Sequence, residues 1–234
     1  NIAITGRLPY DITANIEFIF DKEINGITNI NVNLPAANGS FKGLDNRPRY
    51  TSGSRIHSKI SNAILLKNSN EGYSRNFAVT LEKNSDDRYF WKAGYSYGKT
   101  KNLMDIGTVA YSTWSFNPHH SDPNNPQSAL SMYSPGHRYF AALSMRIKSF
   151  KFGPAMLSLF FDSYTGGRQS YIVAGDLNGD GANSNDLIYV PKDQSEMDFA
   201  EYTSGNRTYT VAEQKAAWDN YINQDKYLSK RRGM

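Results

Sequence analysis

The sequence predicts an all-β fold, a segment of an antiparallel transmembrane β-barrel with long extracellular loops. Three observations predict it. Apolar and polar residues alternate over segments of about 10 residues, the length of a tilted membrane strand. Aromatic residues cluster near the ends of these segments, as in Tyr89-Phe90-Trp91. The connections also alternate between short and long, as outer-membrane barrels pair short periplasmic turns with long outer loops.

The alternation gives each expected strand one apolar and one polar face. The apolar faces consist of Ile12, Ala14, Ile16, Phe18 and Phe20; Tyr73, Phe77, Val79 and Leu81; Tyr89, Trp91, Ala93, Tyr95 and Tyr97; Tyr139, Ala141, Leu143, Met145 and Ile147; and Leu157, Leu159 and Phe161. A soluble sandwich would bury these faces against a second sheet, whereas a barrel would turn them toward lipid. Alternation alone fits both architectures, and the other two observations favour the barrel.

The connections define an expected path through residues 1–165. Residues 7–10, 84–87 and 149–154 read as short turns, and outer loops are expected at about 35–58 and at 99–137. The strands between them should run through 11–34, 59–83, 88–98, 138–148 and 155–165. The kinks at 23–26 and 68–72 should both be bulges in long strands, because a single turn would reverse the path.

These five spanning strands, with a stub before them, would leave two open edges. Open sheet edges do not persist in lipid. We therefore expect residues 1–165 to be one piece of a larger closed barrel. Residues 166–234 should form one large extracellular loop that contains a calcium-type turn and one short helix. Thr210-Val211-Ala212-Glu213 has capping-box spacing, and Val211, Trp218, Tyr221 and Ile222 then line one helical face.

The calcium-type turn lies in the stretch GDLNGDGANSNDLIYVP, residues 175–191. Asp176, Asn178 and Asp180 alternate, and Gly181 follows, as at the start of an EF-hand-type loop. Position twelve is Leu187 where an acid is usual, and Asp186 comes one residue early. The flanks, 170–173 and 187–191, are β-branched and aromatic and read as strand rather than helix.

A structural Ca²⁺ ion is the expected cofactor of this turn. Its ligands would be Asp176, Asn178, Asp180 and Asp186, with the carbonyl of Ala182. The ion would hold together acids that otherwise repel and would fix one shape of a long loop. A polar Gly/Asn/Asp turn without an ion remains the alternative.

Composition excludes several other classes. The 234 residues include no cysteine, so neither a disulfide framework nor a thiolate metal site is expected. Mean hydropathy is −0.60, and no run approaches the 18 apolar residues of a spanning helix. The net charge of +4 comes from interleaved acids and bases, which argues against nucleic acid as a partner. No catalytic constellation is expected, so the chain should not be an enzyme. The adjacent His119 and His120 make a poor bidentate metal pair.

Several motifs together resemble one known family. They are GDLNGDGANSNDLIYVP and YINQDKYLSKRRG, preceded in order by LPYDITANIE, NVNLPAANG, LDNRPRY, NSNEGYS, GHRYFAALSMR and YTGGRQSY. The ordered set, which covers nearly the whole chain, resembles the C-terminal barrel region of Oar-like TonB-dependent outer-membrane receptors. The resemblance implies a barrel of about 22 strands with an N-terminal plug. The plug and the segment that contacts TonB would lie outside these residues.

The resemblance also implies the function that we expect. A TonB-dependent receptor in the outer membrane of a gram-negative cell imports a solute with energy passed from the inner membrane. The expected partners are outer-membrane lipid, TonB through regions outside this chain, and an imported solute that the residues do not identify. Two alternatives stay open, a secreted calcium-binding adhesive β-sandwich domain and a passive porin.

Overall fold

A computed structural model describes residues 1–85, 88–148 and 151–234. The chain divides into two compact units. The first comprises Asn1–Ile30, Leu65–Thr113 and Pro126–Gln169, and the second comprises Asn31–Ile64, Trp114–Asn125 and Ser170–Met234. The second unit therefore collects parts of both expected outer loops as well as the C-terminal region.

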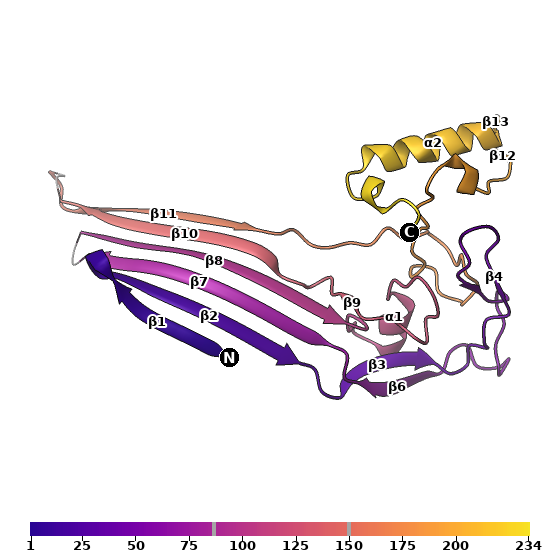
Figure 1. Cartoon of the computed structure of the whole chain (residues 1–234), viewed down its shortest axis with the longest axis horizontal. Helices are drawn as coiled ribbons and strands as arrows, with labels where there is room; N and C mark the ends of the chain where they lie inside the picture. Colours follow the sequence, from indigo (N-terminus) through magenta and orange to yellow (C-terminus); the bar gives the residue numbers. More distant parts are fainter. Residues whose placement is uncertain (86–87, 149–150) are drawn as a thin grey trace. The chain divides into compact units, whose positions relative to one another are not determined.

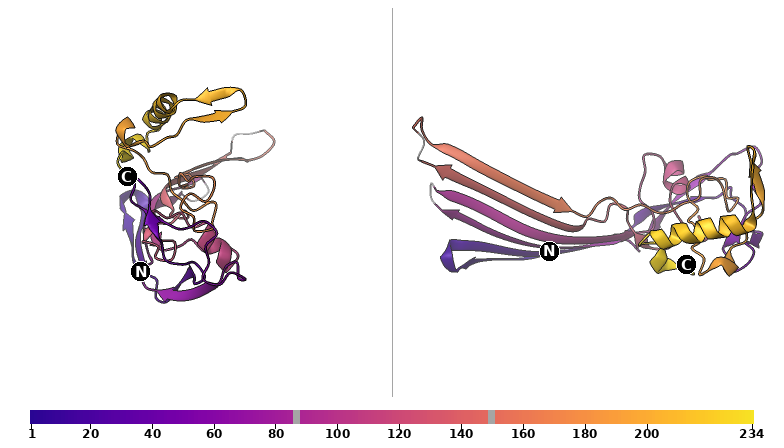
Figure 2. Two further views of the ribbon diagram at one scale, coloured as in Figure 1. Left: turned by 90° about the vertical axis from the view of Figure 1, so that its right-hand side faces the viewer. Right: turned by 90° about the horizontal axis from the view of Figure 1, so that it is seen from above.

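The first unit is built on one antiparallel sheet whose main strands follow each other in chain order. The order is β1 (Ile2–Leu8), β2 (Ile12–Lys22), β7 (Tyr73–Ser85), β8 (Tyr89–Asn102), β10 (Gly136–Ile147) and β11 (Ala155–Tyr164), and β9 (Ala129–Leu130) also pairs with β8. These strands lie side by side (Figures 1 and 2). The predicted all-β, antiparallel character is confirmed. Within the described residues the sheet stays open, because β1 and β11 each have a neighbour on one side only.

The predicted strands agree closely with this sheet. The stub is the full strand β1, which pairs with β2 from Ile2↔Phe18 to Leu8↔Ile12. The first short turn is the 3-10 turn η1 (Pro9–Asp11), in which Tyr10 has a φ of 65°. Strand β8 continues four residues beyond the expected end at 98 and reaches Asn102. The turns expected at 84–87 and 149–154 include residues 86–87 and 149–150, which lie outside the described residues.

The prediction of bulges at 23–26 and 68–72 is wrong. The regular strand is interrupted at both places, but by a break in each strand. Strand β2 ends at Lys22 and β3 (Gly26–Asn31) starts a separate two-stranded sheet with β6 (Ile64–Ser69). The two breaks face each other, since the Glu23 amide donates to the Gly72 carbonyl at 2.9 Å. A bulge offsets one strand, whereas a matched pair of breaks interrupts both strands and keeps the direction of the path.

The connection from β8 to β10 contains the helix α1 (Ala110–Ser115) and strand β9. The second unit contains little regular structure apart from one helix. Its elements are β4 (Gly39–Ser40) paired with β5 (Pro48–Arg49), η2 (Gln194–Glu196), β12 (Tyr202–Ser204) paired with β13 (Arg207–Tyr209), α2 (Val211–Gln224) and η3 (Ser229–Arg231).

Helix α2 starts where the sequence predicts. The Thr210 side chain accepts from the Glu213 amide, and the Glu213 carboxylate accepts from the Thr210 amide, so the capping box is present. The predicted apolar face is only partly buried: Ile222 is fully enclosed and packs with Leu228 and Val190, whereas Tyr221 is 48% exposed. Trp218 borders this small core. No helix within the described ranges is long and apolar enough to cross a membrane.

Candidate functional site

The most extensive feature of the first unit is an apolar sheet face. The register aligns Ile4, Ile16, Val79, Tyr95 and Tyr139 in one row across five strands. A neighbouring row aligns Ala14, Leu81, Ala93, Ala141 and Phe161. Many large side chains of this face are open: Ile4 is 66% exposed and Phe161 is 58% exposed. We call the side of the sheet that carries these two rows the apolar face.

The opposite face of the same sheet is polar. Lys92 forms an ion pair with Glu82 at 3.1 Å, and Arg138 pairs with Asp162 at 2.9 Å, each across neighbouring strands. Hydroxyl and amide side chains such as those of Ser144 and Ser158, which share a hydrogen bond of 2.9 Å, occupy much of the remainder. Strands β2, β7 and β8 therefore have one mainly apolar and one mainly polar face, as alternation predicts. Strand β11 differs, because Met156 and Phe160, 72% and 71% exposed, lie on the same side as Asp162.

Charged residues bound the apolar face at both ends. On β7, Lys83 and Arg75 lie on the same side as Leu81, Val79 and Phe77, because every second residue shares a face. From Lys83 to Arg75 the strand covers roughly 27 Å at about 3.4 Å per residue. Tilted strands would shorten this height somewhat. The dimension is close to the apolar band of about 25 Å on outer-membrane barrels.

The calcium-type turn lies in the second unit, and its acids bind backbone amides. The carboxylate of Asp176 accepts from the amides of Gly179 and Gly181, at 2.8 and 3.0 Å. One oxygen of Asp186 accepts from the amides of Leu177 and Asn178. The turn is thus a set of nested side-chain-to-backbone hydrogen bonds, typical of Asp and Asn in tight turns.

The strands predicted on both flanks of this turn are not formed. Only single bridges occur, between Ile172 and Leu187 and between His119 and Asp186. The Val173 amide donates to the Asp186 carbonyl, and the Ile188 amide donates to the Tyr171 carbonyl. The β-branched flanks do approach each other, but they share a single bridge, and no regular strand develops.

The side chain of Asp180 has no exposed surface. Its Oδ2 accepts from the side-chain amides of Asn185 at 2.8 Å and Asn178 at 3.2 Å, and lies 3.3 Å from His119 Nε2. Its Oδ1 accepts from the Ala182 amide at 2.8 Å.

Burial and hydrogen bonding oppose each other at these acids. Burial alone would raise the pKa of Asp180, but the hydrogen bonds from His119, Ala182, Asn185 and Asn178 outweigh it and hold that pKa below its usual value. At Asp176 and Asp186, burial dominates and raises the pKa. Asp180 is therefore the acid that this environment best stabilises in its charged form.

Two of these partners were missed by the sequence-based prediction. His119 is 94% buried and Asn185 is completely buried. Within the described part of the chain, His119 Nδ1 and Asn185 Oδ1 have no hydrogen-bond partner. Asn185 could have been suspected, since it precedes Asp186 in the same turn. His119 lies 61 positions from Asp180, and no spacing rule links them.

Glycines allow the turn to fold this tightly. Gly179 has a φ of +84°, and a Cβ placed on it would lie 2.3 Å from the Tyr50 carbonyl oxygen. The Tyr50 amide in turn donates to the Asn178 carbonyl at 2.7 Å. Gly181 has a similar φ of +90° but open space around it. Both positions require glycine for backbone conformation, and Gly179 also requires it for space.

The predicted calcium ligands are therefore close together but not free. Across residues 1–85, 88–148 and 151–234, no group of three or more His, Asp or Glu side chains is arranged to hold a metal ion. Asp176 and Asp180 use both carboxylate oxygens on N–H donors. The Ala182 residue is 2% exposed, and its amide is one of those donors. In this arrangement N–H donors occupy the carboxylate oxygens that Ca²⁺ would need, so an ion could bind only by replacing them.

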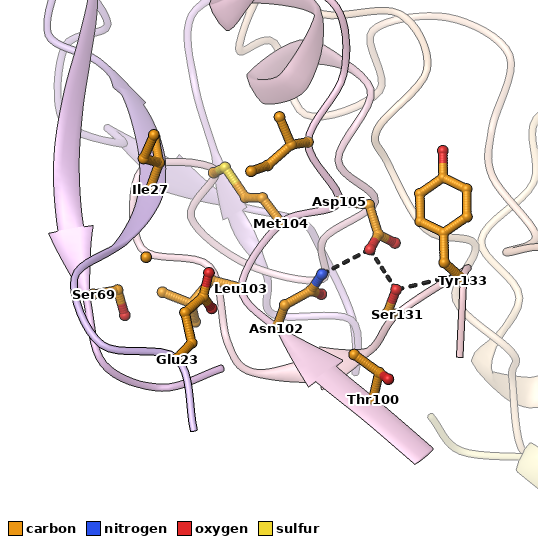
Figure 3. A pocket seen from close by; sticks show the side chains of 12 residues that line it. Glu23, Ile27, Ser69, Thr100, Asn102, Leu103, Met104, Asp105, Ser131 and Tyr133 are labelled. Carbon is orange, nitrogen blue, oxygen red and sulfur yellow. Dashed lines mark hydrogen bonds between the residues drawn. The ribbon is translucent and has the colours of Figure 1, made fainter. Parts of the chain in front are cut away.

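Two hollows could accept small groups. The first, of about 350 Å³, lies in the first unit (Figure 3) and is lined by Glu23, Asp105, Met104 and Tyr133 among others. Asp105 is engaged there, accepting from Asn102, Ser131 and the Met132 amide. The Asp105 carboxylate therefore stabilises this loop through hydrogen bonds.

The second hollow, of about 450 Å³, lies in the second unit between the β12–β13 hairpin and α2. Two ring stacks line it, Tyr202 with Tyr209 at 5.0 Å and Trp218 with Tyr221 at 5.4 Å. Arg207 lies over the Tyr209 ring at 4.7 Å. Such an aromatic surface can bind many apolar or planar groups, so it does not define a ligand.

No protein-family model, curated protein or solved structure matches this chain.

Proposed function

We propose that this chain is a segment of the barrel wall of an outer-membrane receptor that imports a solute, of the TonB-dependent kind. The observation that carries the proposal is the apolar face. Its rows continue across neighbouring strands, its side chains are open, and charges bound it at a height suited to a bilayer. A soluble sheet would have to bury such a face against a second layer.

Three further features support a barrel wall. The strands run in simple up-and-down order, as in outer-membrane barrels. The two edge strands, β1 with 7 residues and β11 with 10, each have, in the described part of the chain, a free edge that could pair with a further strand. The connection between β1 and β2 is tight, whereas those after β2 and β8 are long. The TonB-dependent identity rests on the sequence resemblance, which also favours a receptor over a passive porin.

A lipid-contact scan tests the barrel wall directly. The chain has no cysteine, so single cysteines can be introduced without competition from its own thiols. Spin labels at Val79→Cys and Phe161→Cys should respond to a lipid-soluble relaxation agent in native membranes, whereas labels at Thr80→Cys and Ser158→Cys should respond to a water-soluble one. If both pairs respond alike, the two faces do not differ in lipid contact and the proposal fails.

The intact mass of the native polypeptide, extracted from outer membranes, tests the receptor. A polypeptide several times larger than 26.3 kDa would support a barrel of about 22 strands with a plug. A soluble polypeptide of 26.3 kDa would instead favour the adhesive sandwich domain. A porin would conduct ions when reconstituted, whereas a plugged receptor should not.

Calcium is a separate part of the proposal. We propose that Asp176, Asn178, Asp180 and Asp186, with the Ala182 carbonyl, gather around Ca²⁺ when it is present. The proposal is supported by the oxygen-rich alternation and by the burial of Asn178, Asp180 and Asp186 in one turn. A bound ion would stabilise one conformation of the loop. The strands of the sheet would stay folded without the ion.

A further inference from the structure

A group of cations lies at one end of the apolar face. Arg75 is directly opposite Lys99 across the β7–β8 ladder, and in the next row Tyr73 is opposite Lys101 and Lys22. Every second residue of a strand shares a face, so Lys22, Arg75, Lys99 and Lys101 all lie on the side of Phe20 and Phe77. We call these four residues the cation cluster.

Ring contacts support this placement. The Arg75 guanidinium lies 5.0 Å from the Tyr73 ring centroid and 5.8 Å from that of Phe20. Both rings belong to the apolar face, because Phe20 pairs with Arg75 and continues the series Phe18, Ile16 on β2. Arg75 therefore lies against two aromatic rings at one end of the apolar face. One of them, Phe20, belongs to the neighbouring strand β2.

Within the described residues, none of the four members of the cation cluster forms an ion pair, although Lys92 and Arg138 on the polar face each do. Asp21, the acid next to Lys22 on β2, lies on the polar face because adjacent strand residues point to opposite sides. Directly opposed side chains have Cβ atoms about 5 Å apart, and like charges at this spacing destabilise a sheet. The directly opposed Arg75 and Lys99, with Lys22 and Lys101 in the next row, therefore favour an external anion.

The position of the cluster indicates the kind of anion. It lies just past the apolar band, at the end of β7 and β8 that leads to the long connections. At this depth a barrel strand meets lipid headgroups. The opposite end of the same face carries Lys83, over the Tyr89 ring at 5.8 Å, without such a cluster. On this face, the described strands therefore carry more positive charge at the end that leads to the long connections.

We propose that the cation cluster binds the phosphate groups of an anionic membrane lipid in the leaflet on the side of the long connections. The proposal rests on the proposed function, since only a membrane-embedded sheet would meet a headgroup there. The aromatic side chains of Phe20 and Tyr73 would contact the adjoining apolar part of the lipid, while Arg75 and Lys99 bind phosphate oxygens. Arginine suits this role because its planar fork can bind two oxygens at once.

The test uses the native polypeptide purified in detergent and stripped of lipid. Diphosphoryl lipid A, its dephosphorylated form and inorganic phosphate are titrated separately, and binding is followed by native mass spectrometry. We expect diphosphoryl lipid A to bind, the dephosphorylated form to bind much more weakly, and millimolar inorganic phosphate not to compete. Efficient competition by free phosphate would assign the site to a soluble anion and overturn the proposal.

The decisive variant is Arg75→Gln combined with Lys99→Gln. Each basic residue beside an anionic membrane surface contributes roughly a fivefold factor to binding, so this variant should bind diphosphoryl lipid A about 25-fold more weakly. Lys42→Gln with Lys59→Gln removes two exposed charges outside the sheet and should bind like the native protein. Arg75→Lys with Lys99→Arg keeps both charges and should retain most binding.

Unchanged binding by the Arg75→Gln, Lys99→Gln variant would overturn the proposal. Heat-dependent gel mobility checks that each variant has assembled, and Lys101→Gln alone provides a milder change if the double variant does not assemble. Failure of the proposed function is distinguishable, because the lipid-contact scan of Val79 and Thr80 would then show no difference between faces whatever the lipid titration gives.

Discussion

His119 Nε2 lies 3.3 Å from Asp180 Oδ2, and both side chains are almost completely buried. Asn185 contacts both atoms through its side-chain amide, at 3.0 and 2.8 Å. This group joins residues distant in the sequence and fixes the turn at its most enclosed point. A carboxylate that accepts several hydrogen bonds in a buried site is expensive to remove, because its donors are then left unsatisfied.

Asp180→Ala should therefore loosen the turn. Each buried donor left without a partner costs about 1–3 kcal/mol, so we expect hydrogen exchange over residues 170–190 to accelerate by at least tenfold. Asp198→Ala is the matched control, since Asp198 is exposed in the same unit. Equal exchange in the two variants would show that the buried contacts of Asp180 contribute little.

Gly179→Ala and Gly181→Ala separate backbone strain from steric contact. Both glycines have left-handed φ angles, +84° and +90°, which cost roughly 1–2 kcal/mol for alanine. Only the Cβ at position 179 would meet the Tyr50 carbonyl, at 2.3 Å. We expect Gly179→Ala to destabilise the turn clearly more than Gly181→Ala, as measured by hydrogen exchange at residues 47–51 and 176–186. Equal destabilisation by the two substitutions would mean that residues 47–51 and 176–186 move apart easily to accommodate the Cβ at position 179.

Calcium removal should act locally if the ion binds as proposed. With a chelator present, residues 170–190 should become more sensitive to protease, while the strands β7 and β8 keep their protection. Re-addition of Ca²⁺ should restore resistance, and Mg²⁺ should do so less well because it prefers rigid octahedral sites. Unchanged protease sensitivity of the loop in chelator would count against the ion and favour a turn that is closed by hydrogen bonds alone.

Acid should weaken the C-terminal end of α2. The hydrogen bond from the Tyr171 hydroxyl, with those from the Leu228 and Tyr227 amides, lowers the pKa of Asp225 below its usual value. A lowered folded-state pKa contributes stability that is present above the unfolded value, about 3.9, and is lost as pH falls through the folded one. The same hydrogen bond raises the pKa of Tyr171 to about 12, so this hydroxyl stays protonated at neutral pH.

Hydrogen exchange over residues 221–229, compared between pH 6 and pH 3 after correction for intrinsic rates, measures this effect. The native protein should lose protection at pH 3. Tyr171→Phe keeps the ring but removes the hydroxyl, so its loss should be smaller. A pH dependence that is identical in the two proteins would show that Tyr171 does not set the acid response of Asp225.

The sequence predicted the sheet well because its signal is local. Alternation at Phe18, Val79 or Leu143 is decided by immediate neighbours, and the register follows once the short turns are placed. The capping box at Thr210 and Glu213 is equally local, and it formed as expected. The matched breaks after Lys22 and Ser69 were harder, since a bulge and a break look alike until the partner strand is known.

The turn at 176–186 was only partly predictable, for a different physical reason. Its alternating oxygens are visible in the sequence, but their partners are not. Backbone amides of Gly179, Gly181 and Ala182 occupy the carboxylates, and His119 comes from a distant connection. The flanks also did not form the strands that their composition favours, and single bridges replace a ladder there.

Val79→Arg tests the membrane contact as a free energy. Val79 lies midway between Lys83 and Arg75 on β7, so an arginine there would enter the centre of the proposed apolar band. Such a substitution on a barrel's lipid face costs about 2–4 kcal/mol, and the cost falls toward the interfaces. Thr80→Arg, one residue away on the polar face, should cost much less. Denaturant unfolding of the native polypeptide in lipid vesicles measures both, and an equal cost at the two positions would contradict a lipid-facing Val79.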